Sequence, residues 1–216
     1  MPEDNEYEKF LKKQKVLCSQ YGVDFSKVPD LDQKIFALRN VSQKILDESI
    51  IPSYKNVIKS SKYWTEMWIL SQDEKKNFTP KQKSLLSLFS YSSLAEGMVS
   101  ENVQIIAFLL MQNGHDLYDP RDMKFVDSYK KLGKIDLFIK LQFLERHGFT
   151  FITQAIDRNL RNCITHLEYT VSDDGTIIDE RNDEKIIDIE QKMHLLSCSN
   201  MMVTLALTYL LQSKGL

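Results

Sequence analysis

The chain has 216 residues, and its 28 Lys and Arg against 30 Asp and Glu give a formal net charge of −2. This balance excludes strong non-specific binding to nucleic acid through bulk charge, so any site for a polyanion must be a local patch. Only 7 Gly and 5 Pro occur, too few for a turn-rich all-β fold of this length. The long stretches rich in Leu, Lys and Gln favour helices instead.

The cysteines and the start of the chain indicate the cellular compartment. Cys18, Cys163 and Cys198 are odd in number, far apart and lie in helical patterns, which is typical of buried free thiols in a reducing compartment. Their spacing matches no zinc site, and the first residues lack the apolar core of a signal peptide. No run of about 18 apolar residues occurs, so no membrane span is expected. We therefore expect a cytoplasmic protein without metal, cofactor or membrane segment.

Apolar residues recur at helical spacing over the first 70 residues and predict three helices. The first spans Glu3–Tyr21 and ends at Gly22, where glycine permits the chain to leave the helix. Asp30 is expected to cap the second helix. Pro52 is expected to break or restart the pattern, and the third helix then covers Ser53–Leu70.

The third helix carries an aromatic cluster of Tyr63, Trp64, Met67 and Trp68. Large rings at helical spacing usually pack between helices, and we favour that interpretation. The alternative is a platform on which nucleobases stack, and it requires the rings to be exposed.

The polar segment before Pro80 is the clearest break in the chain, since Thr79 is a good helix cap and proline suits the first helical position. We expect an N-terminal helical extension over residues 1–78 and a helical domain over residues 79–216. The domain begins with a long helix to Asn113, which Gly114 ends. Within it Gly97 permits close packing of a neighbouring helix. Glu96 lies among apolar residues, and it is either a solvated edge residue or a carboxylate that faces a cation of the site.

The second half of the chain predicts further helices and one hairpin. Alternating residues around Asp174-Gly175 predict a β-hairpin. No internal repeat is evident. The predicted segments are a loop over residues 115–125, helices over Lys131–His147 and Phe149–Glu168, a charged loop over Glu180–Lys185 and a last helix over Asp188–Leu211.

Arg161, Asn162 and His166 combine a cation, an amide and an imidazole in six residues. Asn162 and His166 are four apart and share a helix face, whereas Arg161 points roughly 140° away from His166 on an ideal helix. Either the helix end is distorted, or two copies of the helix meet and each supplies part of one site. The opposite face should bury its apolar residues, namely Ile152, Ile156, Leu160, Ile164 and Leu167.

These residue types suit cleavage of a phosphodiester without metal. Arg161 carries a permanent positive charge that fits a phosphate, and His166 exchanges a proton near neutral pH. The imidazole would move a proton while the guanidinium stabilises the developing charge. On residue types alone, a capped helix end with a satisfied histidine is the simpler interpretation.

The run LRNCITHLEY resembles the motif of HEPN domains, in which an arginine, usually followed by a polar residue, precedes a histidine by a few positions. Arg161, Asn162 and His166 match this motif, with four residues between the arginine and the histidine. The motif helix is followed by a short hairpin and a final long helix, which is similar to many prokaryotic HEPN proteins. The resemblance covers roughly Thr79–Leu216, and only the motif region is specific.

The resemblance implies an all-α HEPN-like bundle that forms a homodimer through the motif helix. It implies a metal-independent endoribonuclease, often part of defence or toxin–antitoxin systems, that leaves a 2′,3′-cyclic phosphate and a 5′-hydroxyl. Arg161 would then bind the phosphate, His166 would act as general acid or base, and Asn162 would orient the substrate. To these we add Arg158 and Tyr169 as contacts to the RNA. An antitoxin or regulatory protein is a further expected partner.

Two alternatives remain open at the level of sequence. A non-catalytic HEPN scaffold would bind a nucleotide or a protein partner, and the slightly acidic net charge favours it. A purely structural helical module would be a monomer, with Arg161–His166 covered by its own N-terminal region.

Overall fold

The computed structural model describes most of the chain: residues 16, 19–20, 22, 24–71 and 77–215. Helices account for 66% and strands for 6%, the strands forming two small antiparallel sheets. The predicted all-α class is confirmed at this level, and the finer HEPN-like arrangement stays a prediction. Most of the helix predicted over Glu3–Tyr21, including Cys18, lies outside the described residues.

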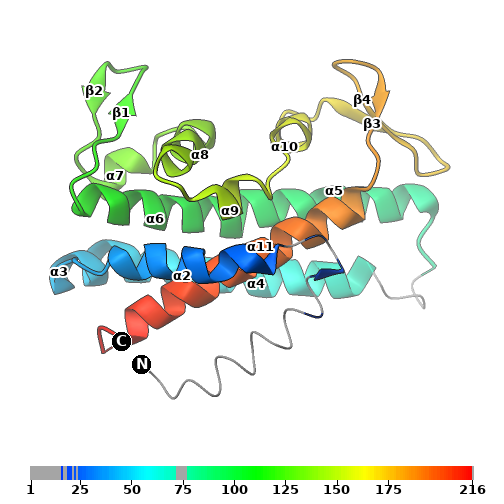
Figure 1. The fold of residues 1–216 in the computed structure, drawn as a ribbon. Coiled ribbons are helices and arrows are strands. Elements are labelled where there is room, and N and C mark those ends of the chain that lie inside the picture. Colours follow the sequence, from blue (N-terminus) through cyan, green and yellow to red (C-terminus); the bar gives the residue numbers. More distant parts are fainter. Residues whose placement is uncertain (1–15, 17–18, 21, 23, 72–76, 216) are drawn as a thin grey trace.

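One long helical rod runs through the middle of the molecule (Figure 1). It consists of α5 (Pro80–Ser93), the π-helical turn η4 (Leu94–Val99) and α6 (Ser100–Gln112). Thr79 caps its first turn through a reciprocal pair of hydrogen bonds with the third helical residue, and Gly114 leaves the helix with φ +89°. The rod predicted from the sequence between these two signals is confirmed.

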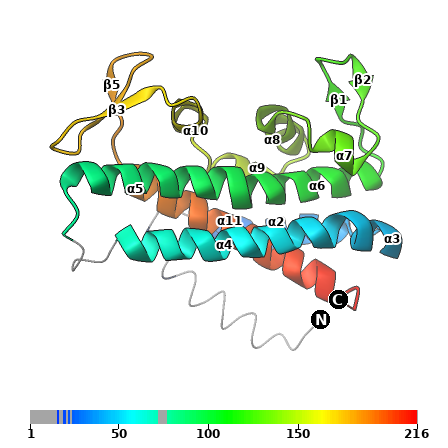
Figure 2. The same ribbon diagram turned by 180° about the vertical axis from the view of Figure 1, so that it is seen from behind.

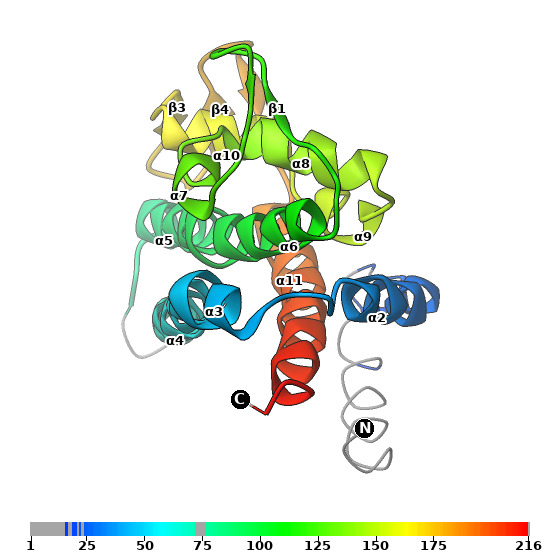
Figure 3. The same cartoon turned by 90° about the vertical axis from the view of Figure 1, so that its left-hand side faces the viewer.

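Helices from both ends of the chain cover one side of this rod (Figure 2, Figure 3). They are η1 (Phe25–Lys27), α2 (Val28–Ala37), α3 (Gln43–Ile45), the π-helical turn η2 (Leu46–Ile50), α4 (Ile51–Ser71) and α11 (Ile189–Gln212). Helix α4 runs along the rod, and α11 crosses beneath it beside α2. Buried side chains from both halves of the chain share one core. The division of the chain at residue 79 stays a prediction.

Two helix boundaries predicted in this layer are wrong. Helix α2 begins after Lys27, and Asp30 lies inside its first turn instead of capping it. Pro52 does not interrupt the helix, because the π-helical turn η2 precedes it and the Ile51 N–H already bonds to the carbonyl of Leu46, five residues back. A wider turn relieves the clash that a proline ring makes with an α-helical backbone.

Close contacts join this layer to the rod. A Cβ atom added at Gly97 would lie 2.9 Å from the Ser60 hydroxyl of α4, which confirms the predicted close approach. Trp64 and Trp68 stack at 6.3 Å between ring centroids and pack against the core, as the core-packing interpretation predicts. Tyr63 is exposed, with Lys59 over its ring at 5.8 Å.

The other side of the rod carries short helices between two hairpins (Figure 1). These elements are β1 (Tyr118–Asp119), β2 (Lys124–Phe125), α7 (Tyr129–Leu132), α8 (Leu137–Arg146), α9 (Thr150–Thr153), α10 (Arg158–Thr165), β3 (Tyr169–Val171), β4 (Ile177–Asp179) and β5 (Glu184–Lys185). The hairpin predicted around Asp174-Gly175 is confirmed by the pairing of β3 with β4. The segments predicted as loops over residues 115–125 and 180–185 instead contain paired strands.

Each of the two helices predicted in this layer is divided in two. The helix over 131–147 is interrupted before Asp136, whose carboxylate accepts the Phe138 N–H at 2.9 Å and starts α8. The helix over 149–168 is interrupted before Asp157, whose carboxylate accepts the Leu160 N–H at 2.9 Å. The Tyr91 hydroxyl of α5 bonds to both the N–H and the carbonyl of Asp157, so a residue distant in sequence stabilises this break.

The two hairpins repeat one local structure 60 positions apart, although the sequence shows no evident repeat. Asp119 ends β1 and accepts the backbone N–H of Arg121 at 3.0 Å, and Asp179 ends β4 and accepts the N–H of Arg181 at the same distance. Each arginine then donates at 3.0 Å to a backbone carbonyl outside its hairpin. The same Asp-x-Arg turn thus fastens a hairpin to each end of this layer.

Two helices meet the length and composition of a membrane span: Pro80–Gln112 and Ile189–Gln212. No membrane span was expected from the sequence. In the most apolar windows of these helices 67% and 56% of the residues are buried inside the molecule, as in core helices of soluble proteins. The cytoplasmic location stays a prediction.

Candidate active site

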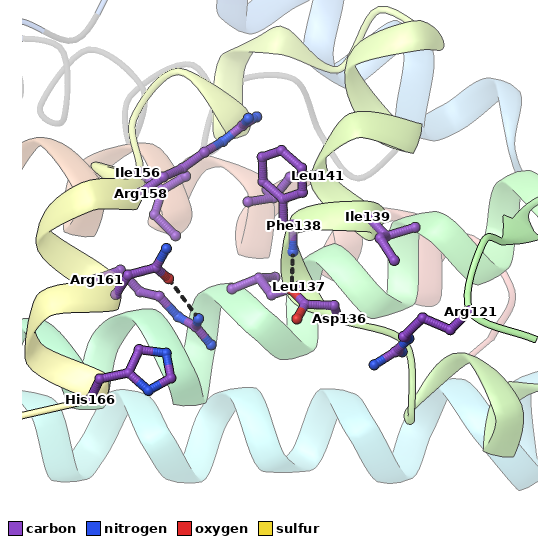
Figure 4. Close-up of a pocket in the computed structure, with 11 residues that line it drawn as sticks. Arg121, Asp136, Leu137, Phe138, Ile139, Leu141, Ile156, Arg158, Arg161 and His166 are labelled. Carbon is purple, nitrogen blue, oxygen red and sulfur yellow. Dashed lines mark hydrogen bonds between the residues drawn. The ribbon is translucent and has the colours of Figure 1, made fainter.

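Helix α10 ends one residue before the histidine of the motif. Its last residue is Thr165, and His166 adopts φ −92° and ψ 2°, outside the helical conformation. The divergence expected between Arg161 and His166 applies only to a straight helix that continues through both. Because the helix end is distorted, both side chains line one cavity of a single chain, in line with the first of the two resolutions (Figure 4).

The cavity lies between α8 and α10 and has a volume of about 350 Å³. On the side of α10 it is lined by Ile156, Arg158, Arg161, Asn162 and His166. On the side of α8 it is lined by Arg121, Asp136, Leu137, Phe138, Ile139 and Leu141. Polar and charged groups thus stand at both ends, with apolar side chains between them (Figure 4).

A carboxylate of the rod fixes the orientation of Arg161. The guanidinium donates to both oxygens of Glu96, from Nε at 2.5 Å and from Nη2 at 3.1 Å, and its Nη1 donates to Asn162 Oδ1 at 3.0 Å. Thr165 also donates to Glu96 at 3.3 Å. The hypothesis that Glu96 faces a cation of the site is confirmed. A guanidinium carries five N–H bonds, so three of them are used and two remain for a ligand.

His166 lies at the mouth of the cavity. Its side chain is exposed, and within the described part of the chain its ring makes no hydrogen bond. Both ring nitrogens are therefore available to a ligand. An imidazole in this state can accept a proton at one nitrogen or donate one from the other.

The two residues added as RNA contacts have different positions. Arg158 lines the cavity, donates to Glu145 at 2.8 Å and lies over the ring of Phe138 at 4.8 Å from its centroid. Tyr169 is half-buried on β3, packs against the core and is not among the lining residues, and burial raises the pKa of its hydroxyl. The structure thus brings Arg158 to the motif and leaves Tyr169 outside the cavity.

Leu167 follows the motif and departs from the prediction that it is buried. Its side chain is 70% exposed, and its backbone has φ +56°. This left-handed conformation turns the chain out of α10 toward β3. The other apolar residues of the predicted face are buried, namely Ile152, Ile156, Leu160 and Ile164.

The half of the cavity formed by Arg121, Asp136 and Phe138 was not predicted from the sequence. These residues lie 20 to 40 positions before the motif and share no spacing with it. The available signal was the Asp-x-Arg turn. Arg121 donates to the Lys134 carbonyl just before α8, and Arg181 donates to the Asn159 carbonyl in the first turn of α10. The two turns therefore hold the two walls of the cavity.

The two cysteines of the described residues are buried thiols. Cys163 and Cys198 are both buried, as predicted, and burial raises the pKa of the Cys163 thiol to about 11. A thiol with a raised pKa is a poor nucleophile near neutral pH. Among the described residues no group of three or more His, Cys, Asp or Glu side chains is placed to hold a metal ion.

Comparisons with models of protein families, with curated proteins and with solved structures found no match to this chain. The geometry of the cavity and the chemistry of its side chains are therefore the basis for a functional assignment.

Proposed function

We propose that the chain is a metal-independent endoribonuclease of the HEPN type that acts as a homodimer, in a defence or toxin–antitoxin setting. The observation that carries the proposal is the arrangement of the motif. Arg161, Asn162 and His166 line one cavity, Glu96 holds the guanidinium, and the imidazole is unengaged within the described residues. This arrangement pairs a fixed positive charge with a free proton carrier, as phosphodiester cleavage requires.

The reaction needs only the substrate's own hydroxyl as nucleophile. The 2′-oxygen of one nucleotide attacks the adjacent phosphorus, its proton passes to a base, and the bond to the 5′-oxygen breaks as that oxygen receives a proton. The products are a 2′,3′-cyclic phosphate and a 5′-hydroxyl. His166 acts as general base or acid, and Arg161 stabilises the negative charge that develops on the phosphoryl oxygens.

The in-line geometry of the displacement supports a dimer. The 2′-oxygen attacks and the 5′-oxygen leaves on opposite sides of the phosphorus, so one imidazole does not reach both atoms at once, and His166 is the one imidazole among the described residues that line the cavity. A second copy of the chain would bring a second imidazole. Leu167, beside His166, offers that copy an exposed apolar side chain at the required place.

The direct test is an RNA-cleavage assay in the presence of EDTA, with the product ends mapped. We expect His166→Ala and Arg161→Ala each to lower the rate by 10²-fold or more, a typical loss for an acid–base or charge-stabilising group. His115→Ala and Arg39→Ala are matched controls, because both residues are exposed and neither lines the cavity. The controls should cleave as the wild type does.

Three results would contradict the proposal. One is equal cleavage by the wild type and both motif variants, which would assign the activity to a contaminant. Another is a requirement for a divalent metal. The third is product ends other than a cyclic phosphate and a 5′-hydroxyl.

A second candidate is a non-catalytic scaffold that binds a nucleotide. Two arginines of the cavity are already paired with carboxylates, Arg161 with Glu96 and Arg158 with Glu145, which lowers the charge available to an RNA backbone. The apolar middle of the cavity suits a base. If the chain cuts no RNA while a nucleotide raises its melting temperature, and His166→Ala leaves that shift unchanged, the scaffold replaces the nuclease.

A further inference from the structure

Half of the cavity is unused by the motif chemistry. The side formed by α8 and the first hairpin presents a carboxylate, an aromatic ring and a guanidinium, from Asp136, Phe138 and Arg121 (Figure 4). These groups face the side of α10 that carries Arg161 and His166. An RNA strand whose scissile phosphate lies at the motif could extend into this half of the cavity.

Phe138 has the properties of a stacking surface. Phe138 is 46% exposed and lines the cavity, so part of its ring is accessible to a ligand. The guanidinium of Arg158 lies over the ring at 4.8 Å, and Glu145 holds that guanidinium at 2.8 Å. The ring is thus supported on one side by a fixed cation, and a base can stack on this rigid platform.

Arg121 provides a cation at the far end of the same half. Its Nε lies 3.5 Å from Asp119, and its Nη2 donates to the Lys134 carbonyl at 3.0 Å. Within the described part of the chain these contacts leave Nη1 for a ligand. Because Asp119 of the hairpin and the Lys134 carbonyl before α8 each contact the side chain, the free edge of the guanidinium is oriented relative to Phe138.

We propose that this half of the cavity is a subsite for the nucleotide next to the scissile phosphate, in which the base stacks on Phe138 and the following phosphate meets Arg121. The proposal rests on the proposed function, since it takes RNA as the ligand. It also specifies the form of that RNA. A base must be unstacked from its neighbours to reach the ring, so the subsite accepts single strands and rejects duplexes.

Binding of an RNA that cannot be cleaved tests the subsite separately from catalysis. The probe is a short fluorescent 2′-O-methyl oligoribonucleotide, which lacks the attacking hydroxyl, and fluorescence anisotropy gives its Kd. Phe138→Ala should raise the Kd roughly 5- to 150-fold, the range for loss of one stacked base, while Phe138→Trp should keep wild-type affinity. Phe125→Ala is the matched control, because Phe125 is an exposed aromatic outside the cavity.

The arginine is tested by salt dependence. Arg121→Gln should reduce the slope of log Kd against log salt concentration by roughly 0.7, the value for one phosphate contact on a single strand. Phe138→Ala should leave that slope unchanged, and so should Arg39→Gln as a surface control. An unlabelled duplex of the same sequence should compete at least tenfold more weakly than the single strand.

The outcomes separate the subsite from the nuclease. If the wild type cleaves RNA but Phe138→Ala binds the probe as tightly as the wild type does, the subsite is wrong and the nuclease stands. If the probe binds in a Phe138-dependent way but cleavable RNA stays intact, the nuclease is wrong and the subsite stands. Absence of probe binding, or equal competition by the duplex, overturns the subsite. Circular dichroism and thermal melting of each variant identify any that fails to fold.

Discussion

At the scale of single residues, the pair formed by Arg161 and Glu96 combines two opposing effects. The carboxylate holds the guanidinium in one orientation, and it also cancels part of the charge that would attract a phosphate. Arg161 is only 20% exposed in its side chain, so its conformation depends on this partner. In the proposed nuclease, this pairing would give up some affinity for RNA to improve the geometry of the reacting complex.

Because Glu96 has two effects, its substitution is expected to change KM and kcat through different causes. Glu96→Gln keeps the shape of the side chain and removes its charge, so we expect a lower KM for RNA and a kcat reduced about tenfold or more through loss of alignment. Steady-state kinetics on one labelled RNA measures both. Glu190→Gln, an exposed residue of α11, controls for the change in net charge. A fall in kcat without any fall in KM would contradict this account.

Asp179 should make the fold around α10 sensitive to acid. Its hydrogen bond from Arg181 lowers the pKa of the carboxyl to about 2. A carboxyl with a depressed folded-state pKa stabilises the fold above its unfolded pKa of about 4, and this stabilisation is lost as the pH falls toward 2. The difference in urea-unfolding free energy between the wild type and Asp179→Asn should therefore be full at pH 7 and shrink below about pH 4. A constant difference would show that the carboxylate charge contributes nothing.

At the scale of elements, helix α4 and the rod approach each other closely at Gly97. A methyl group at Gly97 would meet both Cβ and Oγ of Ser60, at 3.0 Å and 2.9 Å. We expect Gly97→Ala to lower the unfolding free energy by roughly 1–3 kcal/mol, as overpacking does. Because Glu96 is the adjacent residue, the same variant should also reduce catalysis.

A second substitution tests the steric cause. Adding Ser60→Gly to Gly97→Ala removes both atoms in the way, so the double variant should lose less than the sum of the single losses. Ser60→Ala is the matched control, since its Cβ stays in place and should rescue little. Chemical denaturation of the wild type and of the five variants in the two cycles supplies the coupling free energies, and strict additivity in both cycles would exclude the contact as the cause.

The helices that local signals determine were predictable from the sequence. Thr79 and Gly114 delimit the rod through a cap and a left-handed turn, both of which depend only on neighbouring residues. The break before Asp157 was not predictable, because apolar residues continue in helical register across it. It is stabilised by the Tyr91 hydroxyl, 66 positions away. The first hairpin was missed for a related reason, since two-residue strands contain no alternation to detect.

The site, too, was predictable only where its residues lie close together in the sequence. The motif was recognised because its three functional side chains lie within six residues, and Glu96 was suspected because a carboxylate among apolar residues is costly without a partner. The opposite wall could not be predicted from the sequence. Arg121 and Phe138 reach the cavity only because α8 and the first hairpin pack on the rod. Tyr169 was assigned by proximity in sequence, and the turn at Leu167 directs it to the core instead.

At the scale of the whole molecule, the exposed Leu167 gives a test of the proposed dimer. Leu167→Asp should leave stability unchanged, because the side chain is on the surface and aspartate tolerates the left-handed backbone better than leucine does. It should also convert the proposed dimer into a monomer and reduce RNA cleavage in proportion to the fraction of dimer lost. Light scattering after size-exclusion chromatography measures the mass. Ile187→Asp is the control, as an equally apolar exposed residue outside the cavity.

The mass of the wild type decides between the open alternatives. A monomer with normal stability would contradict the dimeric nuclease before any assay of activity. A dimer that survives Leu167→Asp would move the interface away from the end of α10. Either result would leave the cavity and its subsite as properties of one chain.

The π-helical turn Leu94–Val99 has a consequence for the length of the chain. A π-turn holds one residue more than an α-turn, and here it separates the part of the rod that meets α10 from the part that meets α8. Deleting one residue inside this turn would restore a regular α-helix and leave α6 in the same orientation relative to α5. Deleting one residue within α6 instead would rotate the rest of that helix by about 100° and move its contacts with α8 to another side of the rod. The π-turn is therefore the place where the rod can lose a residue and keep the two walls of the cavity aligned.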